Sequence, residues 1–342
     1  MIRGEMVRTS VSKNNWEIFW ARNREAVIGY VFMICVFTLF INAQSNFFSP
    51  YSIKSTFDQF LTLLYAGLAQ TLVILIGGTD FSIGSMIALT NSIAVVIMVP
   101  LANLLGNDMA GIVATIIIVM AIGALAGFIN GLIVVYGKLQ AMIATLATSF
   151  VYTGIGMYLV PKPGGTIVKG YSQLMTGSIS VIPKSLIWLV VAIVLIWIPL
   201  RRSKFGQAIY AVGGNEYSAF TSGINVKRTK LKVFMLSGLF CAMAGLFLTS
   251  YTGSGDPTKC ETFTLNAVAA VVLGGTSLAG GRGGFIGTIA GVITFSLILG
   301  LLVFWKVPTF YQESVKGLIL IFALSVGVLQ KVRIRKRKHL TD

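Results

Sequence analysis

The stretch Ala110–Tyr136 reads AGIVATIIIVMAIGALAGFINGLIVVY, a run of 27 residues without a charged side chain. A hydrocarbon core of about 30 Å is crossed by roughly 20 mostly apolar residues in a helix. A run of this length and composition is therefore typical of a transmembrane helix. Similar apolar runs recur on both sides of it.

The composition of the whole chain also indicates a membrane protein. Hydrophobic residues make up 55% of the 342 positions and charged residues 11%, whereas about a quarter of a typical soluble domain is charged. A water-soluble globule is thereby excluded. We predict an all-α, polytopic bundle of about ten transmembrane helices. The expected spans are 26–41, 60–77, 83–100, 110–136, 141–160, 185–200, 232–252, 264–279, 284–304 and 311–330.

Basic residues are unevenly distributed between the two faces of the predicted bundle. The chain has 27 Lys and Arg against 11 Asp and Glu, a formal net charge of +16. With a cytoplasmic N-terminus, 20 basic residues lie in inner segments and six in outer segments. Because positive charge gathers in cytoplasmic loops, both termini are predicted to be cytoplasmic. Nucleic acid, which the same charge would suggest for a soluble protein, is not an expected partner.

This topology divides the chain into three parts. Residues 1–25 form a cytoplasmic N-terminal segment, 26–330 the transmembrane domain, and 331–342 a basic cytoplasmic tail. A basic run directly after a span is attracted to the anionic inner leaflet. The tail is therefore interpreted as a topogenic anchor in contact with membrane lipid.

Few residues offer catalytic or metal chemistry. The three cysteines, Cys35, Cys241 and Cys260, lie far apart, and the single histidine, His339, is in the tail. Neither a disulfide framework nor a metal site is expected from this pattern, and a membrane-embedded enzyme is disfavoured. The spans are also nearly free of ionisable groups, which argues against a proton-coupled transporter.

Two glycine-rich stretches join predicted spans, and both contain Gly-Gly-Thr. Residues 76–85 read IGGTDFSIGS, residues 273–284 read LGGTSLAGGRGG, and their 197-residue offset hints at a parallel internal repeat. We interpret them either as tight turns or as broken-helix elements bordering a pathway. With neutral polar residues of the spans, they supply the candidate pathway residues Gly77, Gly78, Asp80, Phe81, Ser82, Asn91, Asn130, Thr145, Asn266, Gly274, Gly275 and Thr276.

The inner loop 201–232 contains a predicted short helix. Asn215 is a good N-cap and Gly223 a natural C-terminal stop, so residues 216–222 are expected to be helical. Tyr217 and Phe220 are three residues apart and therefore share one face of this helix. Such a helix either docks in a groove of a partner protein or lies against its own membrane domain.

Four blocks of the sequence carry a family resemblance. They are GGTDFSIGSMIALT (77–90), AGFINGLIVVYGKLQAMIATLAT (126–148), FGQAIYAVGGNEYSAFTSGINVKRTK (205–230) with LSGLFCAMAGL (236–246), and LNAVAAVVLGGTSLAGGRGGFIGTIAG (265–291). These blocks resemble the permease subunits of bacterial ABC importers for monosaccharides. That branch includes the ribose, arabinose, xylose, galactose and autoinducer-2 permeases.

The resemblance implies a subunit that translocates a small neutral sugar and pairs with a second permease subunit, identical or closely similar. It also implies a cytoplasmic ATP-binding subunit that hydrolyses ATP, and a periplasmic or lipid-anchored sugar-binding protein. This chain itself is expected to bind no cofactor. In that family the Gly-Gly-Asn-Glu segment contacts the ATPase. The coupling residues expected here are Gly213, Gly214, Asn215, Glu216, Tyr217, Phe220 and Gly223.

A self-contained secondary transporter or facilitator of a small polar solute is the alternative interpretation. The resemblance also leaves the sugar open. The outer segment 256–261 carries Lys, Cys and Glu where small or polar residues are common in the family. The sequence leaves open whether the second permease subunit is a copy of this chain.

Overall fold

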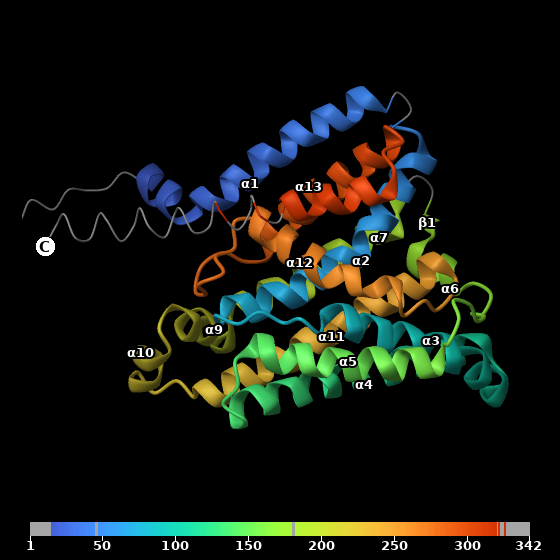
Figure 1. Cartoon of the computed structure of the whole chain (residues 1–342), viewed down its shortest axis with the longest axis horizontal. Helices are drawn as coiled ribbons and strands as arrows, with labels where there is room; N and C mark the ends of the chain where they lie inside the picture. The colour runs from blue at the N-terminus through green and yellow to red at the C-terminus, as the bar shows by residue number, and fades with distance from the viewer. Residues whose placement is uncertain (1–14, 45–46, 180–181, 320, 322–324, 326–342) are drawn as a thin grey trace, which may run out of the picture.

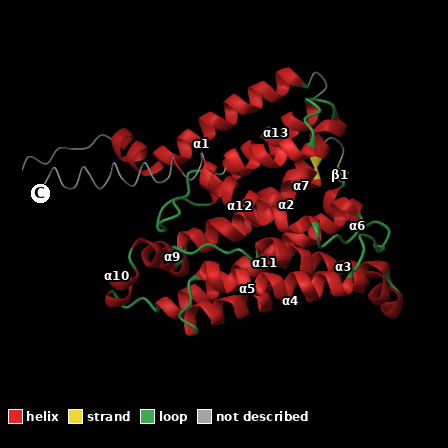
Figure 2. Ribbon diagram, in the orientation of Figure 1, coloured by secondary structure: helices red, strands yellow, loops and turns green. Residues whose placement is uncertain are grey.

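The computed structural model describes residues 15–44, 47–179, 182–319, 321 and 325. This part of the chain is a bundle of helices with one small antiparallel hairpin (Figure 2). The hairpin consists of β1 (Ser178–Ile179) and β2 (Ile182–Pro183), with Ile179 paired to Ile182. The predicted all-α, polytopic class is thereby confirmed.

The chain is helical again over residues 309–319, and up to residue 304 the helical elements follow one another in order. They are α1 (Asn15–Ala43), α2 (Pro50–Leu75), α3 (Ile83–Leu105), α4 (Asp108–Tyr136), α5 (Ala141–Leu159), α6 (Tyr171–Thr176), α7 (Lys184–Val191), the π-helix η1 (Ala192–Trp197), α8 (Ile198–Arg202), α9 (Lys204–Gly214), α10 (Glu216–Thr221), α11 (Val226–Thr252), the 3₁₀-helix η2 (Lys259–Glu261), α12 (Thr262–Leu273) and α13 (Phe285–Phe304).

Seven helical stretches in the described residues are long and apolar enough to cross a membrane. They are Tyr51–Leu75, Ile83–Leu105, Asp108–Tyr136, Ala141–Leu159, Lys184–Arg202, Val226–Thr252 and Phe285–Phe304, and each overlaps one expected span. The expected span 26–41 lies inside α1. The described apolar part of this helix, Gly29–Ala43, is shorter than the seven stretches above. The expected span 311–330 falls only partly within the described residues.

The expected span 264–279 is wrong in its length. α12 has 12 residues, so it is about 18 Å long and too short for a hydrocarbon core of about 30 Å. The helix ends because Gly275 takes a left-handed conformation with φ +81°. Thr276 N then donates to Val271 O at 3.2 Å and Gly275 N to Val272 O at 2.9 Å, which is the Schellman pattern.

α2 ends in the same capping geometry. Gly77 has φ +81° and donates from its backbone N to Ile74 O at 2.8 Å, while Gly78 N donates to Val73 O at 3.0 Å. Gly77 thus occupies the structural position of Gly275. These two residues are 198 positions apart, whereas the two Gly-Gly-Thr sequences are 197 positions apart. The two turns are alike, but the Gly-Gly-Thr match is one residue out of structural register.

α11 lies at the centre of the bundle, where it packs against α2, α3 and α4. Small residues bring α11 and α4 into backbone contact. A Cβ atom added to Gly127 of α4 would overlap Phe234 O, and one added to Gly123 would lie 2.6 Å from Gly238 O. Helices in lipid associate through such close packing, since lipid supplies no hydrophobic drive between them.

The bundle has two distinct ends. Figure 1 shows α9 and α10 at one end, and α6 and the hairpin at the other. Basic side chains gather at the first end: Lys227 Nζ lies 5.9 Å from the centroid of the Tyr136 ring, and Lys232 Nζ lies 5.8 Å from that of Phe205. We call these the α10 end and the hairpin end.

α3 begins inside the bundle. After α2, the chain turns back and runs through the interior before α3 starts (Figure 1). Asn130, six residues before the end of α4, donates to Ser82 Oγ at 2.7 Å, so α3 begins about 9 Å short of that end. Gly84 N donates to Thr264 Oγ1 at 2.9 Å. The amino ends of α3 and α12 therefore meet within the bundle, which favours the broken-helix interpretation of 76–85.

Candidate functional site

The predicted short helix in the loop 201–232 is present as α10. Asn215 caps it, because its Oδ1 accepts from Ser218 N at 2.8 Å. Gly223 ends it with φ +82°, while Gly223 N donates to Phe220 O and Ile224 N to Ala219 O. Both capping roles are confirmed, and the helix ends at Thr221, one residue earlier than expected.

The two aromatic residues of α10 project away from the bundle. The Tyr217 side chain is 77% exposed and that of Phe220 is 68% exposed, whereas Ala219 on the opposite face is buried. Glu216 is held by the chain itself, since its Oε2 lies 2.6 Å from Lys230 Nζ of α11. α10 is therefore tied to α11 on one side and presents an apolar surface on the other.

The two glycines before α10 differ in their surroundings. Gly213 faces the bundle, where an added Cβ would overlap Leu75 O and lie 2.7 Å from Gly281 N. Gly214 is exposed, and an added Cβ would have no described neighbour within 4 Å. Only Gly213 thus requires the absence of a side chain.

Five of the candidate pathway residues come together at the start of α3. Ser82 donates to Asp80 Oδ1 through its backbone N at 2.8 Å and through Oγ at 2.6 Å, and Asn130 joins them from α4. Phe81 N donates to Thr145 Oγ1 of α5 at 2.8 Å. The Asp80 carboxylate is fully buried at the amino end of α3, where a helix dipole stabilises negative charge.

Tyr152 belongs to this cluster, although it was not among the expected residues. Its hydroxyl donates to Ala126 O at 2.9 Å and lies 3.1 Å from Asn130 Oδ1. The sequence does carry a signal for it. Thr145, Thr148 and Tyr152 are spaced by three and four residues on one face of α5, and all three are buried.

Asn91 lies elsewhere, about 12 Å further along α3 from Ile83. Its Nδ2 donates to Thr249 Oγ1 at 2.8 Å and to Ser254 O at 3.2 Å, and its Oδ1 accepts from Asp256 N at 3.0 Å. It therefore fastens α3 to the end of α11 and to the loop that follows.

Replacing Asn91 with alanine is expected to destabilise the folded protein by about 2 kcal/mol, because buried partners are left unpaired. Thermal unfolding in detergent measures the loss, and faster proteolysis near Lys259 should accompany it. Asn42→Ala is the control, since the described hydrogen bond of exposed Asn42, to Thr38 O, lies within its own helix. An unchanged melting temperature for Asn91→Ala would contradict the role given to this amide.

Three more candidate pathway residues, Gly274, Gly275 and Thr276, lie in the connection between α12 and α13, whereas Gly77 and Gly78 form the turn after α2. Gly274 packs directly on Gly287 of α13, and Thr276 Oγ1 accepts from Gly284 N at 3.2 Å. Asn266 is half-buried on α12, and no described hydrogen bond joins it to Asp80 or Ser82. The predicted set is therefore divided among the cluster at the start of α3, Asn91 further along that helix, the turn after α2, and the segment formed by α12 and its connection to α13.

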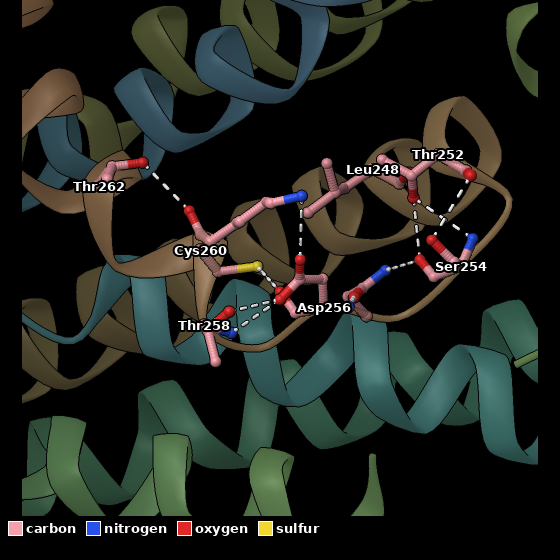
Figure 3. Close-up of polar contacts among 9 residues, drawn as sticks. Leu248, Thr252, Ser254, Asp256, Thr258, Cys260 and Thr262 are labelled. Carbon is pink, nitrogen blue, oxygen red and sulfur yellow. Dashed lines mark hydrogen bonds and ion pairs between the residues drawn. The ribbon is translucent and has the colours of Figure 1, made fainter. Parts of the chain in front are cut away.

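Hydrogen bonds and an ion pair hold the loop 253–261 at the hairpin end (Figure 3). Asp256 Oδ1 accepts from Thr258 N at 3.2 Å and from Thr258 Oγ1 at 2.6 Å, and Asp256 Oδ2 lies 3.3 Å from Lys259 Nζ. Burial tends to raise the pKa of the Asp256 carboxyl, but the hydrogen bonds from Thr258 and Lys259 outweigh it and hold this pKa below its ordinary value. The loop therefore presents an ionised pair in which Lys259 is 84% exposed.

Comparison of the sequence with known proteins identifies its family. Residues 52–324 match the family described as branched-chain amino acid transport system / permease component. The chain belongs to this permease family. The matched range begins near the start of α2 and extends beyond α13, so it includes α10 and the Asp80 cluster.

Three relatives cover most of the permease. The ribose import permease protein RbsC of Bacillus subtilis (strain 168) is 37% identical over 86% of this chain and 89% of its own. RbsC of Haemophilus influenzae is 35% identical over 86% of this chain and 90% of its own. The galactose/methyl galactoside import permease protein MglC of Escherichia coli (strain K12) is 31% identical over 89% of this chain and 94% of its own. No solved structure matches the permease.

These relatives confirm the resemblance to monosaccharide import permeases. Together with the seven apolar helices, they identify the permease as a multi-pass integral protein of the bacterial inner membrane. Its relatives are transport components, which agrees with the expectation of a transport subunit.

Proposed function

We propose that the permease carries a small neutral sugar across the inner membrane as one subunit of an ATP-binding-cassette importer. Its relatives are named for ribose and for galactose and methyl galactoside import. The scarcity of ionisable side chains in the spans suits an uncharged, hydroxyl-rich solute. Ribose is the first sugar to test, since the ribose import permeases reach 37% and 35% identity.

The observation that carries this proposal is α10, a capped helix with two exposed aromatic side chains at the basic end of the bundle. Aromatic side chains on a short helix suit a groove on a partner protein. In the proposal that partner is a cytoplasmic ATP-binding subunit, which hydrolyses the ATP, so this chain binds no cofactor. A second permease subunit, a copy or a close paralogue, completes the translocation unit.

The proposed topology follows the charges. The α10 end is cytoplasmic, because Lys227, Lys232 and their basic neighbours lie there. Both termini are on the same side, with about ten crossings in 26–330, of which the one that begins with α12 is only partly helical, and the segments 1–25 and 331–342 are in the cytoplasm. The hairpin end is periplasmic, where the loop 253–261 faces a periplasmic or lipid-anchored sugar-binding protein.

In the proposed mechanism, ATP binding by the partner moves α10 and tilts the helices, so that a central pathway opens alternately to each side. The Asp80 cluster fixes the start of α3 against α4 and α5 through hydrogen bonds of 2.7 and 2.8 Å. α3 therefore moves together with those two helices. Selectivity rests mainly with the binding protein.

Reconstitution into proteoliposomes tests the proposal. The permease is combined with candidate ATPase and ribose-binding subunits, and uptake of radiolabelled ribose or galactose is measured. Uptake is expected only when both partners and ATP are present. Sugar movement by the permease alone, or driven by an ion gradient without ATP hydrolysis, would refute the proposal and favour a secondary transporter.

A further inference from the structure

Three glycine segments meet without intervening side chains at the α10 end. They are the end of α2 (Leu75–Gly77), the end of α9 at Gly213, and Gly280–Gly281 in the connection between α12 and α13. We call this contact the glycine junction. Gly281 N donates to Leu75 O at 2.9 Å, which links the first segment to the third.

Each segment is in backbone contact with the other two. A Cβ atom added to Gly280 would lie 2.7 Å from Gly213 O and 2.9 Å from Gly77 N. One added to Gly213 would overlap Leu75 O and lie 2.7 Å from Gly281 N. Gly280 and Gly281 also have φ of +84° and +70°, which other residues rarely adopt.

α9 holds the connection between α12 and α13 at a second point. The Tyr210 hydroxyl donates to Gly283 O at 2.9 Å. Tyr210 and Gly213 are three residues apart and so lie on the same face of α9. That face is therefore fixed to the connection along about one helical turn.

The glycine junction joins α9, and through it α10, to α2 and to the connection between α12 and α13 by contacts between backbone atoms. α10 follows α9 with only Asn215 between them, so a displacement of α10 acts directly on Gly213. The ion pair between Glu216 and Lys230 is a weaker tie, because the Glu216 side chain is 59% exposed and such pairs contribute little. Side chains can change rotamer to absorb a shift, whereas backbones in direct contact move together.

We propose that Gly213, with Gly280 and Gly281, transmits movement of α10 to α2, α12 and α13. Gly213 is thus a positioning residue for transport: it links α10 to the turn that leads to the Asp80 cluster and to the connection that leads into α13. This inference rests on the proposed docking of an ATP-binding subunit at α10.

The test compares Gly213→Ala and Tyr210→Phe with the wild type in the reconstituted importer. Sugar transported per ATP hydrolysed is expected to fall about tenfold in Gly213→Ala and by less in Tyr210→Phe. Binding of the ATPase subunit should stay within about twofold, because Tyr217 and Phe220 are untouched. Gly154→Ala on α5 is the matched control, since an added Cβ there has no neighbour within 4 Å.

A folded Gly213→Ala with an unchanged ratio of sugar to ATP would overturn the inference. If Gly213→Ala fails to fold, Tyr210→Phe decides. This variant removes one hydroxyl without adding bulk: a reduced ratio supports the inference and an unchanged ratio overturns it. A wild-type permease that never binds the ATPase would instead refute the proposed function, and this inference with it.

Discussion

Replacing Gly127 with leucine is expected to prevent the chain from reaching its folded state in the membrane. A Cβ atom at this position would overlap Phe234 O and lie 3.0 Å from both the N and the Cα of Gly238. All these neighbours are backbone atoms, so no rotamer change makes room. The expected cost exceeds the about 3 kcal/mol that overpacking of a core usually causes, because α4 and α11 must separate.

Size-exclusion chromatography of the detergent-solubilised protein measures this effect. Gly127→Leu should yield aggregated or degraded protein, while the wild type elutes as one sharp species. Gly154→Leu is the control, since Gly154 is an exposed helical glycine with open space around it. A monodisperse Gly127→Leu variant with a wild-type melting temperature would show that the two helices are not in backbone contact.

Simultaneous replacement of Tyr217 and Phe220 by alanine is expected to abolish binding of the ATP-binding subunit. Central aromatic residues of an interface commonly cost about 2 kcal/mol each when truncated, so the pair should weaken binding by about three orders of magnitude. Both side chains are largely exposed, at 77% and 68%, so the fold should be unaffected. Pull-down and surface plasmon resonance with the purified ATPase measure the loss.

Tyr51→Ala is the matched control for this prediction. Tyr51 is 80% exposed at the start of α2, in the part of the helix far from Leu75 and the glycine junction. Its replacement should leave ATPase binding unchanged. Wild-type binding by the double variant would mean that α10 does not dock, and the proposed coupling would have to move to another surface.

Local signals in the sequence predict local structure well here. Asn215 and Gly223 define α10 because capping depends on the residue's own side chain and backbone freedom. The apolar runs predict seven of the crossing helices for a similar reason: hydropathy over about 20 residues decides membrane insertion. The expected span extends to residue 279, whereas α12 ends at Leu273 because Gly275 turns the chain in a left-handed conformation.

Contacts between distant segments could not be predicted in the same way. Gly213 and Gly214 are identical neighbours in the sequence, yet only Gly213 meets Leu75 and Gly281. Which glycine is indispensable depends on how α2, α9 and the α12–α13 connection cross, and no local pattern encodes that. For Tyr152, the spacing from Thr145 and Thr148 is visible in the sequence, but the contact with Asn130 depends on how α4 and α5 pack.

The short length of α12 has a consequence for biogenesis. A helix of 12 residues is too short to span a bilayer by itself, and the irregular backbone that follows its Schellman turn has to be shielded from lipid by protein. Its partners for shielding are α2, made long before it, and α13, made directly after it. We therefore expect α12 to integrate only once α13 has emerged from the ribosome, so that residues 262–304 enter the membrane together.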